Sequence, residues 1–113
     1  MNRYRIRSRI WIESGDKVLL GEGRVILLKA IDEHGSLSQA AKSIHMSYKK
    51  AWTLVDAVNK LAKKEVVQKI TGGRSGGGAS ITPYGKKLID AFDNINQNCW
   101  IFLDKELKVL EKL

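Results

Sequence analysis

Residues 36–63, with the sequence SLSQAAKSIHMSYKKAWTLVDAVNKLAK, decide the fold. Ser36 is followed three residues later by Gln39, a pairing typical of the start of a helix. Ser47 is placed to cap a second, longer helix that runs to about Lys63. Two helices joined by a short turn predict a helix-turn-helix, whose second helix enters the major groove of DNA.

The second of these helices is amphipathic. Its apolar residues recur at intervals of three and four, as expected for one buried face. They are Ala51, Leu54, Val55, Val58, Leu61 and Ala62. The first turn of a groove helix and its polar face usually contact the DNA. The residues predicted to do so here are Ser47, Tyr48, Lys49, Lys50, Thr53 and Lys60. For Lys60 the alternative, equally supported, is a solvent-exposed residue that makes no DNA contact. Trp52 is expected to cover the edge of the core rather than to contact DNA.

A β-hairpin is predicted over residues 66–81, directly after the helix-turn-helix. Its two short apolar runs flank a glycine-rich tip that contains Arg74 and Ser75. Such a hairpin is the wing of a winged helix-turn-helix. Glycines let the backbone of the tip approach a phosphate or a narrow minor groove, so we expect both tip residues to contact DNA. The alternative is a tip that makes no contact.

A half-buried N-terminal strand is predicted over residues 4–12 by an alternation of two kinds of side chain. Isoleucine or serine stands at positions 6, 8, 10 and 12, and arginine or tryptophan at positions 5, 7, 9 and 11. Ser14 to Asp16 predict a turn before a possible second strand over residues 17–20. A helix is expected from about Gly23 to Glu33.

The last helix is predicted over residues 82–112, with Thr82 as its cap and Pro83 at its first position. It carries an apolar seam with heptad spacing. The seam comprises Leu88, Phe92, Ile95, Cys99 and Phe102. Because the helix is too long for the core of one small domain, we expect the seam to form a homodimer interface. Packing of the seam within its own chain is the alternative.

The predicted fold class is therefore mainly α with a small β component (α+β). We expect residues 1–113 to form a single winged helix-turn-helix domain with an N-terminal strand and a long C-terminal dimerisation helix. Its parts are the helix-turn-helix at 36–63, the wing at 66–81 and the dimerisation helix at 82–112.

The net charge of +8 is confined to one part of the chain. Residues 42–87 carry ten basic and two acidic residues, whereas the first 41 residues carry +2 and the last 26 carry −2. A segment of one sign indicates a polyanionic partner, double-stranded DNA or other nucleic acid first and a membrane surface second.

Several other function classes find no support in the sequence. The glycine run lacks the Gly-Lys-Ser/Thr end of a phosphate-binding loop, and no catalytic motif is present, so we expect no enzyme and no cofactor. His34 and His45 have no further ligand at metal-binding spacing, which predicts no metal site. A lone cysteine, no signal peptide and no membrane span lead us to expect a cytoplasmic protein.

Several stretches resemble the DNA-binding part of the ModE family of molybdate-dependent transcription regulators, and more loosely the LysR-type helix-turn-helix. The matching stretches are GEGR at 21–24, GSLSQAAK at 35–42, MSYKKAW at 46–52, TGGRSGGGA at 71–79 and ITPYG at 81–85. The resemblance covers roughly residues 6–100. It implies a winged helix that dimerises through its terminal helices and binds a palindromic operator. The chain ends before the family's molybdate-binding part, so we expect no molybdate binding.

Three functions remain open at this point. The first is a dimeric, sequence-specific transcription regulator. The second is a basic RNA- or ribosome-associated protein, against which the net acidic last helix argues. The third is a protein–protein adaptor with the same fold, for which Lys49 and Arg74 would be dispensable.

Overall fold

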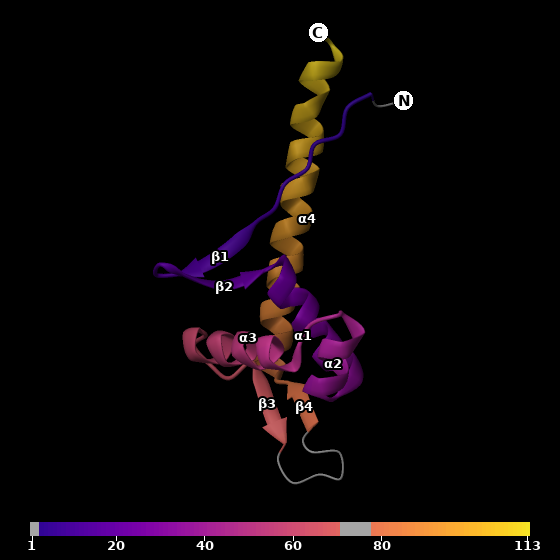
Figure 1. The fold of residues 1–113 in the computed structure, drawn as a ribbon. Helices are drawn as coiled ribbons and strands as arrows, with labels where there is room; N and C mark the ends of the chain where they lie inside the picture. The colour runs from indigo at the N-terminus through magenta and orange to yellow at the C-terminus, as the bar shows by residue number, and fades with distance from the viewer. Residues whose placement is uncertain (1–2, 71–77) are drawn as a thin grey trace.

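The computed structural model describes residues 3–70 and 78–113 as a helix-rich α+β structure (Figure 1). The elements are β1 (Trp11–Ser14), β2 (Lys17–Gly21), α1 (Glu22–His34), α2 (Leu37–Ser43), α3 (Tyr48–Leu61), β3 (Val67–Ile70), β4 (Gly78–Ile81) and α4 (Pro83–Glu111). Two antiparallel hairpins, β1–β2 and β3–β4, form the described sheets.

The elements are arranged along α4, whose 29 residues span about 44 Å at 1.5 Å per residue. The longest dimension of the molecule is 62 Å. Figure 1 shows α1, α2, α3 and the β3–β4 hairpin around the first part of α4, while its second part extends away beside the N-terminal segment. The core lies around the first part of α4. Its largest fully buried side chains are Leu20, Leu27, Leu28, Ile31, Val55, Val58, Val66 and Val67.

The predicted helix starts are confirmed by capping hydrogen bonds. The hydroxyls of Ser36, Ser47 and Thr82 each accept a hydrogen bond from the backbone N–H three residues later, at 3.2, 3.1 and 2.9 Å. The expected helix from about Gly23 to Glu33 is confirmed as α1, which ends at His34 and is followed by Gly35 with φ of +66°. Glycine reaches this left-handed conformation without a Cβ penalty, which explains why the helix stops there.

The predicted N-terminal strand over residues 4–12 is wrong for most of its length, since β1 begins only at Trp11. The alternation in burial is nevertheless present. Ile6, Ser8 and Ile10 are partly buried, whereas the arginines between them are exposed. The segment lies along α4 instead of a neighbouring strand (Figure 1). An extended chain hides every second side chain whether a sheet or a helix covers it.

The predicted hairpin is confirmed as far as it is described. Val67 pairs with Ile81 and Ile70 with Gly78 in an antiparallel ladder. The backbone N–H of Ala79 also donates to the carbonyl of Gly35 at 3.1 Å, which attaches β4 to the loop between α1 and α2.

Asn59 fixes the hairpin to α3. Its side-chain oxygen accepts hydrogen bonds from the N–H groups of Val66 and Val67, at 2.9 and 3.0 Å, and its amide donates to the Val67 carbonyl at 2.9 Å. One side chain thus satisfies three backbone groups that the first residues of the hairpin would otherwise leave unpaired.

The predicted seam on α4 divides into two parts. Phe92 is 3% exposed in the core, so its assignment to a dimer interface needs correction. It has little surface left for a second chain, because the long helix begins inside its own domain. Leu88 packs against that core but is only partly buried, so its place in a dimer interface stays a prediction. Ile95 and Phe102 are exposed by 50% and 61%, and Cys99 is partly buried.

Candidate nucleic-acid interface

A compact turn sets the position of α3 relative to α2. The N–H of Met46 donates to the carbonyl of Ala41 at 2.9 Å, and His45 has φ of +56°. The buried face of α3 then anchors the helix, with Ala51 and Val55 at 0% and Val58 at 1% exposure. A helix held on one face by such residues has a fixed outward face.

The first turn of α3 presents polar and basic side chains to solvent. Tyr48 is 56% exposed, and Lys49 and Lys50 are also exposed. By contrast, the Ser47 hydroxyl caps the helix, and the Thr53 hydroxyl donates to the Lys49 carbonyl at 2.9 Å. Among these five predicted contacts, the side chains of Tyr48, Lys49 and Lys50 are exposed to solvent. The hydroxyls of Ser47 and Thr53 are instead hydrogen-bonded to the backbone of the helix.

Lys60 lies three turns further along α3 and is less available. Its ammonium nitrogen is 2.9 Å from a carboxylate oxygen of Asp56, one turn earlier on the same helix. An opposite charge at this distance reduces the attraction of Lys60 for a phosphate. Arg74 and Ser75, the predicted contacts from the hairpin tip, lie outside the described residues.

Lys69 on β3 was not among the predicted contacts, although the structure brings it to the same face. Its ammonium group lies 4.5 Å from the centroid of the Trp52 ring on α3. Trp52 is 44% exposed, so it covers the core only in part and offers a ring face to this lysine. The contact joins residues 17 positions apart, and helical periodicity gave no signal for it.

Three observations bear on the other function classes. In residues 3–70 and 78–113 no helix is both long and apolar enough to cross a membrane. The same residues contain no group of three or more His, Cys, Asp or Glu side chains arranged around a common point. The chain matches no protein-family model.

Several proteins of known name are similar in sequence to most of this chain. It is 42% identical over 81 residues to the DNA-binding transcriptional dual regulator ModE of Escherichia coli, covering 72% of this chain and 31% of that protein. The chain is similar to the ModE regulators. It is also 37% identical over 89 residues to the molybdenum transport protein ModE of Azotobacter vinelandii, covering 79% of this chain and 33% of that one.

A third relative carries a different name. The molybdenum-pterin-binding protein MopB of Rhodobacter capsulatus is 49% identical over 76 residues, 67% of this chain and 28% of MopB. Its name weighs against our expectation of no molybdate binding. The chain spans about a third of the length of these three proteins. Their names are those of regulators or of proteins that handle molybdenum, and none is the name of an enzyme.

Proposed function

We propose that this chain is a sequence-specific, DNA-binding transcription regulator with a winged helix-turn-helix fold. In this proposal α2 and α3 form the helix-turn-helix, α3 enters the major groove, and the β3–β4 hairpin is the wing. The names of the ModE relatives support the regulatory role. The excess positive charge of residues 42–87 supports DNA as the partner.

One observation carries the proposal: Tyr48, Lys49 and Lys50 are exposed at the start of a helix whose opposite face is anchored in the core. The N-terminal residues of a recognition helix are those that contact base edges. Lysine is suited to the O6 and N7 acceptors of guanine, and a phenolic hydroxyl both donates and accepts hydrogen bonds.

We further propose a homodimer that binds a palindromic operator, with the outer part of the seam as the contact. Ile95 and Phe102, together with Ile101, Val109 and Leu110, leave the second part of α4 with large exposed apolar side chains. An isolated helix with such a surface is stabilised by burying it against a partner.

The test is a set of binding titrations on selected operator duplex, random duplex and RNA over a series of salt concentrations. We expect the operator to bind most tightly and its affinity to fall steeply with salt, because Lys and Arg release counterions from the phosphates. Equal affinity for all three nucleic acids, or a flat salt response, would contradict the proposal. RNA bound more tightly than the operator would instead support the RNA-associated alternative.

The name of MopB supports a second candidate function, binding of a molybdenum ligand that controls the DNA affinity. It is tested by titrating the operator at constant ionic strength with and without molybdate. A change in affinity above about threefold, which is roughly 0.7 kcal/mol of coupling, would establish molybdate as an effector. An identical affinity would leave the regulator without this ligand.

A further inference from the structure

Four arginines form an exposed row on the N-terminal segment. Arg3, Arg5, Arg7 and Arg9 occupy alternate positions and are all exposed. In an extended chain, alternate side chains lie on one side about 6.5–7 Å apart. We call these four residues the arginine row. The expected DNA contacts on α3 and the hairpin do not use it.

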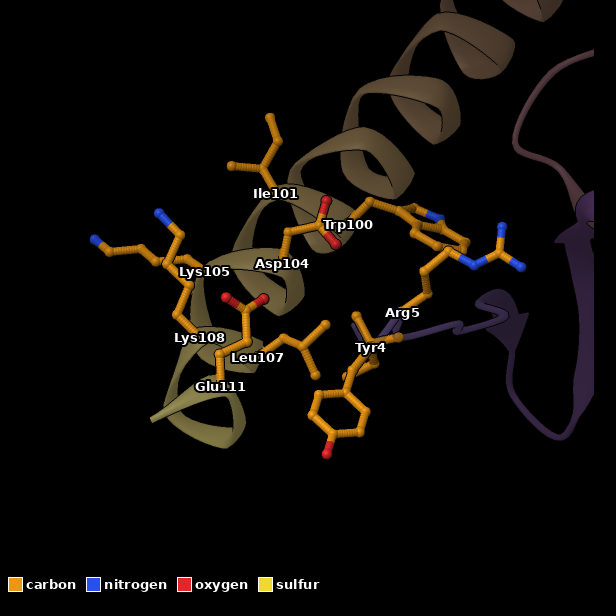
Figure 2. A pocket seen from close by; sticks show the side chains of 10 residues that line it. Tyr4, Arg5, Trp100, Ile101, Asp104, Lys105, Leu107, Lys108 and Glu111 are labelled. Carbon is orange, nitrogen blue, oxygen red and sulfur yellow. The ribbon is translucent and has the colours of Figure 1, made fainter. Parts of the chain in front are cut away.

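The residues between the arginines hold the segment on α4. Tyr4 and Ile6 line a groove together with Trp100 and Leu107, and Arg5 lies at the same groove. Figure 2 shows Tyr4, Arg5, Trp100 and Leu107 from close by. Further along, the Ser8 hydroxyl lies 3.9 Å from the Cys99 sulfur. The segment that carries the row is therefore attached to a helix, while the four arginine side chains stay exposed.

The charges of the row are nearly uncompensated within the chain. Among the described residues the row makes one ion pair, in which Arg9 lies 3.7 Å from Glu22 and both side chains remain mostly exposed. Arg5 extends its guanidinium away from the carboxylates of Asp104 and Glu111 on α4 (Figure 2). A row of like charges without partners is costly unless a polyanion binds to it.

A second copy of the chain does not supply that polyanion. Residues 100–113, in the part of α4 that lies beside the row, carry three acidic and three basic residues and so have no net charge, and each copy adds a further net charge of +8. A membrane surface fits less well than nucleic acid. Membrane-binding segments insert apolar side chains beside their basic ones, whereas Ile6 lines the groove along α4 and Ile10 packs against the core. Trp11, at the end of the row, is 56% exposed, so binding to vesicles is one outcome of the test below.

The position of the row separates it from α3. Figure 1 shows the N-terminal segment beside the second part of α4, while α3 and the β3–β4 hairpin lie at the other end of the molecule. We propose that the arginine row is a second, sequence-independent binding surface for the phosphate backbone of duplex DNA, which lets one protein hold two duplex segments. This inference rests on the proposed function in taking DNA as the ligand.

The test compares two variants that lose the same charge at the same end of the molecule. Arg3→Gln/Arg5→Gln/Arg7→Gln removes most of the row and keeps the pair between Arg9 and Glu22. The control, Lys105→Gln/Lys108→Gln/Lys112→Gln, removes three exposed lysines, two on α4 and one directly after its end. Each protein is loaded on an immobilised operator duplex and then offered a labelled random duplex, and the captured label is measured.

We expect the wild-type protein and the lysine control to capture the second duplex and the arginine variant to lose most of this capture. The salt slope for random duplex should also become shallower by about 0.9 for each phosphate contact that is lost. Unchanged capture and slope in the arginine variant would overturn the inference. So would a change in its sedimentation mass with unaltered DNA binding, which would assign the row to a contact between copies.

Two further results keep this inference distinct from the proposed function. Arginine-dependent capture by a protein without preference for any operator would support the row and contradict sequence-specific regulation. If the wild type and the arginine variant bound the operator equally and neither protein captured a second duplex, the result would support the regulator and overturn the inference about the row. Binding of the row to anionic phosphatidylserine vesicles but to no duplex would also overturn it.

Discussion

The ammonium group of Lys69 lies 4.5 Å from the centre of the Trp52 ring, which connects the hairpin to the exposed side of α3. A cation over an indole face at an exposed site contributes about 0.5–1 kcal/mol. The contact is placed to hold β3 in a fixed orientation beside the first turns of α3, so it affects both stability and DNA binding.

A double-mutant cycle with Trp52→Leu and Lys69→Met measures this interaction. We expect a coupling free energy of about 0.5–1 kcal/mol in urea unfolding, since the methionine keeps much of the lysine stem but not its charge. Lys64 and Tyr84, whose corresponding distance is 6.0 Å, form a matched pair that should couple more weakly. Additive effects of the two substitutions would show that the lysine and the ring do not interact in solution.

Lys49→Ala should weaken operator binding more than binding to random duplex. If Lys49 contacts a base, the operator complex should lose about 1–3 kcal/mol and its preference at that base pair should relax. Arg74→Ala, in the predicted wing tip, should weaken both complexes to a similar degree because a phosphate contact carries no sequence information. Titrations of each variant on both duplexes make the comparison. Equal losses for Lys49→Ala on the two duplexes would make Lys49 a phosphate contact.

The two parts of the α4 seam should respond differently to substitution. Phe92→Ala opens a cavity in the core and should lower the free energy of unfolding by about 3–5 kcal/mol. Ile95→Glu/Phe102→Glu places charges on exposed positions, so it should leave the fold of each chain intact while halving the sedimentation mass and weakening operator binding. Sedimentation and circular dichroism on the same samples distinguish the two effects. A dimer that survives the double glutamate substitution would exclude this part of α4 as its interface.

Local rules in the sequence explain which parts of the fold were predictable. Helix starts could be predicted at Ser36, Ser47 and Thr82, because a cap needs only a side-chain oxygen and a backbone N–H three residues away. The alternation at residues 4–12 was visible, but a strand beside a helix and a strand in a sheet bury the same side chains. The heptad spacing of Leu88 to Phe102 likewise gives a buried face without saying which chain covers it.

The remaining features depend on contacts between distant residues. Asn59 bonds the backbone of Val66 and Val67, and Lys69 meets Trp52, only after α3 and the hairpin have packed together. No periodicity marks such positions, because one polar side chain in a helix is equally compatible with solvent. The arginine row was equally hard to interpret from the sequence. The alternation shows that its side chains lie on one side of the segment, but the distance between the row and α3 depends on the length of α4.

Gly85, in the first turn of α4, lies where two parts of the chain come closest together. A Cβ atom at this position would stand 2.6 Å from the carbonyl oxygen of Val66 and 2.8 Å from a methyl carbon of Ile81. Backbone at that distance cannot move aside without displacing β3. Gly85→Ala should therefore destabilise the protein, although alanine has the higher helix propensity by about 0.8–1 kcal/mol.

Gly23→Ala in the first turn of α1 is the matched control, because an added Cβ there meets no atom within 4 Å. This substitution should raise the free energy of unfolding by about 0.4–1 kcal/mol, mainly by restricting the unfolded chain. The measurement is thermal and urea unfolding of both variants beside the wild type. A Gly85→Ala protein as stable as the Gly23→Ala protein would mean that α4 and β3 are not in close contact, and that the hairpin is not held against the start of the long helix.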